Sequence, residues 1–185
     1  MTRVMNPRNE DNKRIWRAVS KRARFNVIDD TGTQFSALMR EVSEIMAGAA
    51  WKARQLGVTL LEAVSGVVRP ALRRALAPGG DPLMGAKAIV LGIISGAGAK
   101  KRAALKVLSH TTRAIIRQTA RWNGDVGAVV TGLVRGAISG SKRMGVSTGR
   151  AALAVVTVAI EEVYRIGSFE PVPVNADFRQ RIGGP

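Results

Sequence analysis

Apolar positions recur at helical spacing through most of the chain, and this pattern repeats every 44 residues. Sliding residues 125–168 back by 44 positions places Gly136 on Gly92, and a second slide places it on Gly48. A fixed period of about 20–50 residues is typical of repeated supersecondary units. The sequence therefore predicts an N-terminal arm (1–36), three units (37–80, 81–124 and 125–168) and an extended tail (169–185).

Start signals for helices indicate that each unit is a pair of helices joined by a turn. Thr59 follows a glycine stop in the first unit, and Asp81 and Asp125 begin the second and third units. A hydroxyl or carboxylate at such a position caps the free amide groups of the first turn, and Pro82 suits the first helical position. We therefore expect an all-α fold of three 44-residue αα-hairpin repeats packed through glycine and alanine faces.

Proline and glycine inside the predicted helices modify this picture. Pro70 lies within the second helix of the first unit and predicts a kink or break near 68–69, because proline lacks the amide donor. Small residues recur every four positions in the first helix of the second and third units, so they share a face on which another backbone can approach closely. This face either mediates association, within the chain or between chains, or packs the two helices of one hairpin together. The candidate packing residues are Gly48, Gly92, Gly96, Gly132, Gly136 and Gly140.

Charge is the strongest feature of the composition, with a formal net charge of +16. The second unit is the most basic, with eight Lys and Arg residues against one acid. Cations in its second helix recur at spacings of three and four, which places them on one face, and no acid lies nearby in sequence. Such a face is either simply solvated or binds a polyanion. These residues are Arg102, Lys106, His110, Arg113, Arg117 and Arg121, preceded by Lys100 and Lys101.

The N-terminal arm adds a second basic segment. A short helix over 11–25 would carry Arg14, Arg17 and Lys21 around an apolar side that includes Trp16. This helix either docks through Trp16 with a solvated charged face or acts as a basic arm for a polyanion. The tail contains several prolines and glycines and is expected to be extended.

Residues for catalysis or metal binding are scarce. The chain has no cysteine, and its one histidine, His110, lies among cations and not beside a nucleophile. The neighbouring Glu161 and Glu162 would point about 100° apart on a helix, which is poor geometry for a catalytic pair. No segment reaches the roughly 18 apolar residues of a membrane span. We therefore expect no enzymatic activity, cofactor, metal or small-molecule substrate, and a cytoplasmic location, free or at the surface of a membrane or granule.

Several short motifs resemble a group of bacterial Gly/Ala-rich α-helical repeat proteins that have no established activity. The motifs are Thr111–Ile116, Gly124–Gly127, Gly136–Gly140, Gly145–Ser147 and Ile166–Gly167. The resemblance implies a bacterial origin and an all-helical repeat fold. Members of the group typically carry acids after the Gly-Ala-Ile-x-Gly motif, whereas this chain has Lys142 and Arg143, so its electrostatics differ.

Three functions are compatible with these features. The first is a non-enzymatic scaffold that forms homo-oligomers or joins a larger complex and binds a polyanion through basic helix faces. The second is a nucleoid-type protein that binds nucleic acid without sequence preference, since there are few aromatic residues for base stacking. The third is an amphipathic coat on an anionic membrane or polymer-granule surface.

Overall fold

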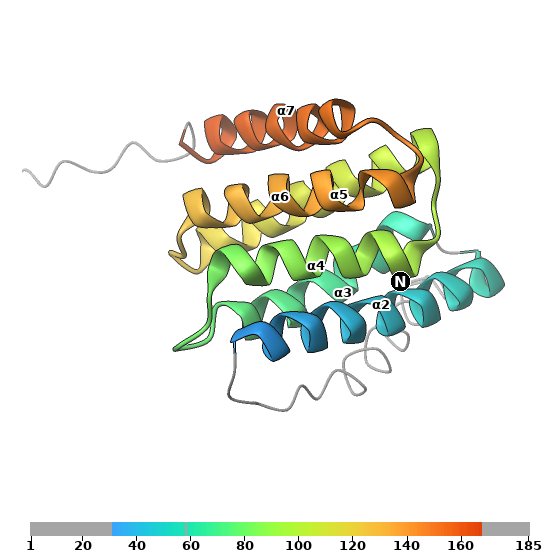
Figure 1. Ribbon diagram of the computed structural model, residues 1–185, viewed down its shortest axis with the longest axis horizontal. Helices are drawn as coiled ribbons and strands as arrows, with labels where there is room; N and C mark the ends of the chain where they lie inside the picture. The colour runs from blue at the N-terminus through green and yellow to red at the C-terminus, as the bar shows by residue number, and fades with distance from the viewer. Residues whose placement is uncertain (1–30, 58, 168–185) are drawn as a thin grey trace, which may run out of the picture.

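The computed structural model describes residues 31–57 and 59–167, and this part of the chain is all-helical, as predicted (Figure 1). The N-terminal helix predicted over 11–25 and the tail predicted over 169–185 lie outside the described residues. The described helices, in chain order, are α2 (Thr31–Leu56), α3 (Leu60–Ala75), α4 (Pro82–Ala97), α5 (Lys101–Arg121), α6 (Val126–Met144) and α7 (Thr148–Gly167).

Three of these helices start at the caps that the sequence predicted. The Thr59 hydroxyl accepts a hydrogen bond from the Glu62 amide, and the Glu62 carboxylate accepts one from the Thr59 amide at 2.9 Å. The Asp81 carboxylate accepts from the Met84 amide at 3.0 Å, and Asp125 accepts from Ala128 at 2.9 Å. Each cap satisfies an amide that the helix itself leaves without a partner.

The break predicted at Pro70 does not occur, because α3 continues from Leu60 to Ala75. Val67 and Val68 before the proline and Ala71 and Leu72 after it are all buried. Their tertiary packing therefore holds the helix together across the missing hydrogen bond. Helices α4 and α6 do end sharply, at Gly98 and Gly145, whose φ angles of 60° and 67° favour glycine.

The helices form two layers of an open stack. In one layer α2 packs against α4, and α4 packs against α6; in the other, α3 packs against α5, and α5 packs against α7. Figure 1 shows α2, α4 and α6 one above the other, with α7 at the top edge. Among the described helices, those of the first hairpin (α2 and α3) do not contact those of the third (α6 and α7). At each end of the stack, the last hairpin has no further hairpin packed against it among the described residues.

Aliphatic side chains from every hairpin fill the space between the layers. Completely removing one such side chain from water contributes about 1.5–3 kcal/mol, so this continuous core is the main stabilising term. Its largest members include Met46, Leu72, Ile89, Ile93, Leu108, Ile115, Ile116, Leu133 and Met144.

The glycine rows of α4 and α6 contact the first helix of the preceding hairpin. A Cβ atom added to Gly92 would lie 2.7 Å from the Met39 carbonyl oxygen of α2, and one added to Gly96 would overlap the Ser43 carbonyl. Gly92 and Gly96 therefore pack between hairpins, against α2, and not against the other helix of their own hairpin.

The third hairpin uses its glycines in the same way, but the first cannot. A Cβ added to Gly132 would overlap the Leu83 carbonyl of α4, and one on Gly136 would lie 3.1 Å from the Lys87 carbonyl oxygen. At Gly140 the contact is the Ile94 side chain, at 2.8 Å. Within residues 31–57 and 59–167, by contrast, nothing lies within 4 Å of a Cβ added to Gly48. The described part of the chain contains no hairpin that precedes α2 and could cover Gly48.

Candidate functional site

The predicted basic face lies on α5, and its opposite side forms part of the core. Val107, Leu108, Thr111 and Ile115 are buried, whereas the six predicted face residues are exposed or half-buried. The helical prediction for this segment is therefore confirmed. The environment of the six residues differs along the helix, because α3 and α7 lie on either side of α5.

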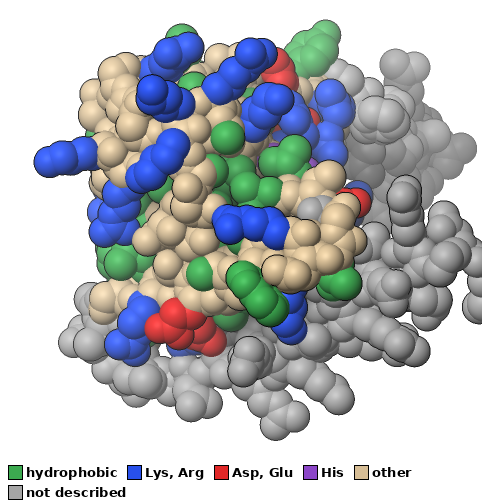
Figure 2. Space-filling view, turned by 90° about the vertical axis from the view of Figure 1, so that its right-hand side faces the viewer, with side chains coloured by type: hydrophobic (Ala, Val, Ile, Leu, Met, Phe, Trp, Pro, Cys, Tyr) green, Lys and Arg blue, Asp and Glu red, His purple; other side chains and the backbone are tan. Residues whose placement is uncertain are grey.

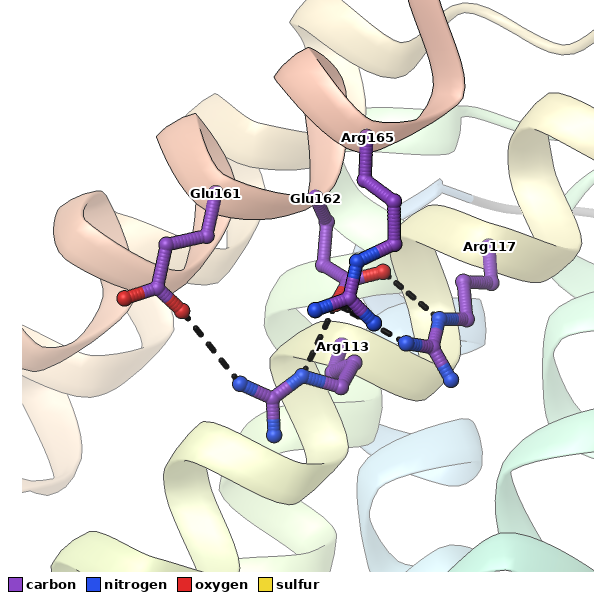
Figure 3. A network of polar contacts seen from close by, with 5 residues as sticks. All are labelled: Arg113, Arg117, Glu161, Glu162 and Arg165. Atoms are coloured by element: carbon purple, nitrogen blue, oxygen red, sulfur yellow. Dashed lines mark hydrogen bonds and ion pairs between the residues drawn. The ribbon is translucent and has the colours of Figure 1, made fainter. Parts of the chain in front are cut away.

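The middle of the basic face is neutralised by α7 (Figure 3). Arg113 Nε lies 2.9 Å from Glu162 Oε1, and Arg117 Nε and Nη2 lie 2.6 and 3.0 Å from the two oxygens of the same carboxylate. Arg113 also reaches Glu161 at 3.4 Å, and Arg165 lies 3.6 Å from Glu162. No acid lies near Arg113 and Arg117 in sequence, but folding brings in acids from 45 or more positions away to pair with them.

Glu162 is the centre of this network and is completely buried, with 0% side-chain exposure. Burial alone would raise the pKa of its carboxyl, but hydrogen bonds from Arg117 and Arg113 hold the pKa below its ordinary value. The carboxylate is therefore charged at neutral pH. Its two main partners retain 34% and 40% side-chain exposure, so water also solvates the arginines.

His110 contacts α3 and adds little charge to the face. Its Nε2 atom lies 2.7 Å from the Ser65 hydroxyl. Burial lowers the pKa of the imidazole, and the positive charges of Arg113 and Arg117 lower this pKa further. The side chain is therefore neutral at physiological pH and acts as a polar contact between α3 and α5.

Cations that remain exposed gather where α4 joins α5 and α6 joins α7. The Lys100 ammonium donates to the Arg143 carbonyl, and Arg143 Nη1 lies 3.3 Å from the Ser95 hydroxyl, so the two connections are in contact. Figure 2 looks at this end of the molecule and shows Lys and Arg side chains spread over much of its upper part, with few acids among them. We call this cluster the basic end; it consists of Lys100, Lys101, Arg102, Lys142 and Arg143.

The remaining predicted cations are divided between described and undescribed parts of the chain. Lys106 and Arg121 are exposed on α5, one close to the basic end and the other at the far end of the helix. Arg14, Arg17 and Lys21 lie outside the described residues.

Sequence reasoning missed Lys142 and Arg143 as members of the basic surface. The 44-residue period could have identified them, because it aligns these residues with Gly98 and Ala99, directly before Lys100. Residues at equivalent positions in neighbouring repeats lie at the same end of a stack.

Acidic residues in the described part are almost all engaged in holding the fold. Glu62, Asp81 and Asp125 cap helices, Glu41 lies 3.3 Å from Arg74, and Glu161 and Glu162 bind arginines. Burial raises the pKa of the Glu41 carboxyl, and the charge of Arg74 opposes this effect. The excess of Lys and Arg is consequently not cancelled at the basic end, where neither connection contributes an acid.

Residues 31–57 and 59–167 contain no group of three or more His, Asp or Glu side chains placed to hold a metal ion. Within the same residues, no helix combines the length and apolar character needed to cross a lipid bilayer. Comparison of the chain with models of protein families and with curated proteins found no match. The resemblance to bacterial Gly/Ala-rich repeat proteins therefore stays a prediction.

Proposed function

We propose that this protein is a non-enzymatic helical scaffold that binds a polyanion through its exposed basic surface and assembles into a larger complex. The observation that supports this most directly is that the acidic side chains are mostly engaged within the fold, whereas many basic side chains are exposed on the surface. Six of the seven acids in the described part cap helices or pair with arginine, whereas the cations of the basic end lie on the surface without an acid in either connection.

The basic end suits a ligand with many regularly spaced negative charges. Its five cations come from two connections held together by the Lys100 and Arg143 contacts, so they form a compact group. Binding a polyanion such as DNA or heparin would release condensed counterions, which makes affinity fall steeply with salt. The paired arginines of α5 would contribute less, because Glu162 already offsets their charge.

Two double variants test this proposal. Arg102→Gln with Lys142→Gln removes two charges from the basic end, and Arg40→Gln with Arg69→Gln removes two exposed charges from α2 and α3. In a salt series with double-stranded DNA, each lost phosphate contact should reduce the slope of log K against log salt by about 0.9. We expect the first variant to lose about two units of slope and to elute from heparin at lower salt. Equal losses in the control would show that only net charge matters.

Nucleic acid is one candidate for the polyanion, and the basic end favours it. The described part has few aromatic side chains on which bases could stack, and Arg73 covers the Trp122 ring at 5.7 Å. Binding would then depend on phosphate and not on base sequence. DNA fragments of unrelated sequence should therefore bind with equal affinity, measured by mobility shift at physiological salt.

A coat on an anionic membrane or granule is the other candidate, favoured by a row of exposed apolar residues on α7. Leu153, Ile160 and Tyr164 are 65%, 65% and 78% exposed. An amphipathic helix of this kind can lie in a lipid interface when cations accompany it. Co-sedimentation with vesicles containing phosphatidylserine, compared with neutral vesicles, tests this candidate.

A further inference from the structure

The third hairpin exposes positions that the first two hairpins bury. Val156, Ile160 and Val163 of α7 are 39%, 65% and 47% exposed. One period earlier, Thr112, Ile116 and Thr119 of α5 are fully buried. Two periods earlier, the equivalent residues Val68, Leu72 and Ala75 of α3 are 1%, 0% and 6% exposed.

The covering element can be identified from the stack itself. Each hairpin before the last is followed by another hairpin, and α7 differs from α3 and α5 in having no such neighbour among the described residues. We define the end face as the exposed apolar surface that results. It consists of Ile138 of α6 and Leu153, Val156, Ile160 and Val163 of α7.

The opposite end of the stack lacks the complementary neighbour. Gly92 and Gly136 each receive the backbone and side chains of a preceding helix, but no atom of the described residues lies within 4 Å of a Cβ added to Gly48, their equivalent in α2. We define the start face as the surface around this glycine. It also includes the first-hairpin residues that align with positions where the second and third hairpins contact the hairpin before them. It consists of Glu44, Gly48 and Lys52 of α2 and Arg74 of α3.

We propose that the end face of one molecule binds the start face of a second copy, so that the hairpin stack continues from chain to chain. This deepens the assembly part of the proposed function and is independent of its polyanion part. The end face continues from Ile138 along α6 as a ridge that contains Val130, Thr131 and Val134, and this ridge would enter the start face. These three residues are the equivalents of α4 residues Ala86, Lys87 and Val90. Those α4 residues already contact Gly132 and Gly136 within the chain.

The α2–α4 and α4–α6 junctions show that the glycine row of one helix can pack against the preceding helix at two positions that differ by one helical turn. Gly92 contacts Met39 and Val42, whereas its equivalent Gly136 contacts Lys87 and Val90, which lie four positions further along their helix after alignment. Residues four apart lie on the same helix face. Gly48 of a second copy would therefore meet the α6 ridge in either register.

Charge also favours this orientation. Arg117 pairs with Glu162 across the junction between the second and third hairpins. At the junction between two molecules, the position equivalent to Arg117 is Glu161 of the first molecule, and the position equivalent to Glu162 is Arg74 of the second copy. Glu161 is 53% exposed and Arg74 is 21% exposed. Within its own chain, Arg74 also lies 3.3 Å from Glu41. The in-chain pair would thus be repeated with its polarity reversed.

A head-to-tail contact of this kind does not close on itself after two subunits, so it generates open chains of variable length. The decisive experiment blocks each face separately. Ile160→Asp places a charge on the end face, and Gly48→Gln fills the start face. Neither position is covered by the described residues, so both variants should fold. The controls are Ser139→Asp and Trp51→Gln. Both positions align with Ser95, which is exposed although α4 has a helix packed on each side. A residue at this position is therefore expected to lie outside the contact between hairpins.

Sedimentation velocity over a concentration series should show growing species for the wild type and both controls, and monomers for each blocked variant. Mixing the two blocked variants in equal amounts should give a species of two chains and nothing larger, because one intact start face meets one intact end face. Dimers of Gly48→Gln alone would indicate contact between two end faces and would overturn the proposal. A wild type that stays monomeric at every concentration would also overturn it.

Two further outcomes separate this inference from the polyanion proposal. The Arg102→Gln, Lys142→Gln variant should associate as the wild type does, even where it loses heparin binding. If Ile160→Asp instead abolishes binding to phosphatidylserine vesicles while leaving the mass distribution unchanged, the end face contacts lipid, and the head-to-tail contact is refuted.

Discussion

The two layers of the stack join their helices by different means. In the layer of α2, α4 and α6, backbone approaches backbone at glycines, as at Gly96 against the Ser43 carbonyl and Gly132 against the Leu83 carbonyl. In the layer of α3, α5 and α7, long side chains make the contact, as Arg113 and Arg117 do with Glu162. Substitutions that add atoms at the glycines should therefore destabilise the layer of α2, α4 and α6. Substitutions that remove one member of an ion pair should destabilise the layer of α3, α5 and α7.

Gly132→Ala should have the largest effect, because the added methyl group would overlap the Leu83 carbonyl oxygen. That oxygen belongs to a helix backbone and cannot rotate away, so α4 and α6 must separate. We expect a loss of about 3 kcal/mol in the free energy of unfolding, at the upper end for overpacking. Urea denaturation followed by circular dichroism measures this change.

Gly136→Ala is the matched control in the same helix. Its Cβ would lie 3.1 Å from the Lys87 carbonyl oxygen, a tight contact that a small shift relieves. Alanine also gains about 1 kcal/mol of helix propensity over glycine, which offsets part of the strain. Stability should change by less than about 1 kcal/mol. Equal losses at both glycines would contradict the proposed sensitivity to backbone overlap.

Glu162→Gln should have an intermediate effect and acts on the other layer. The change leaves Arg113 and Arg117 without their charged partner, and both guanidiniums remain partly solvated. Breaking a completely buried pair costs about 3–5 kcal/mol, so we expect a smaller loss of about 2 kcal/mol at pH 7. Glu161→Gln should change stability by less than about 1 kcal/mol, since that carboxylate is half-exposed and its contact is longer.

The pH dependence of the free energy of unfolding tests whether the charge of the Glu162 carboxylate causes the stability loss expected for Glu162→Gln. Because the pKa of Glu162 is lowered in the folded state, its contribution is present above the unfolded value of about 4.3 and is lost as pH falls through the folded value. His110 acts in a higher window: its lowered pKa makes the unfolded state bind more protons below about pH 6.5. Glu162→Gln should flatten only the more acidic part of the profile, whereas His110→Gln should flatten the part near pH 6.

Local signals were sufficient to predict the helices and their starts. Asp81 and Asp125 carry their capping chemistry in their own side chains, and the amides they bind lie three residues away. The 44-residue period likewise required no tertiary information. The sequence did not show that the helix would continue through Pro70, because that depends on buried neighbours, which only the packed structure provides.

The candidate site could be predicted only in part, because charge pairing depends on residues distant in sequence. Arg113 and Arg117 look like free cations until α7 places Glu162 against them, 49 and 45 positions later. The period already relates these regions, but it does not say which side of α7 turns toward α5. Lys142 and Arg143 differ from this case, because the period alone places them beside Lys100; the hydrogen bond from Lys100 to the Arg143 carbonyl becomes apparent only in the packed structure.

Gly48→Ala should change the free energy of unfolding least and should raise it, whereas the changes at Gly132 and Glu162 lower it. Gly48 lies in the middle of α2, and no described residue has an atom within 4 Å of an added Cβ. No overlap with the described part of the chain therefore opposes the higher helix propensity of alanine. We expect the free energy of unfolding to rise by about 0.5–1 kcal/mol, measured at a concentration where the protein is monomeric. At high concentration the same methyl group should weaken association, because it would meet the α6 ridge of a second copy as Gly136 meets Lys87 and Val90. A loss of stability in the dilute monomer would show that Gly48 is already covered within its own chain.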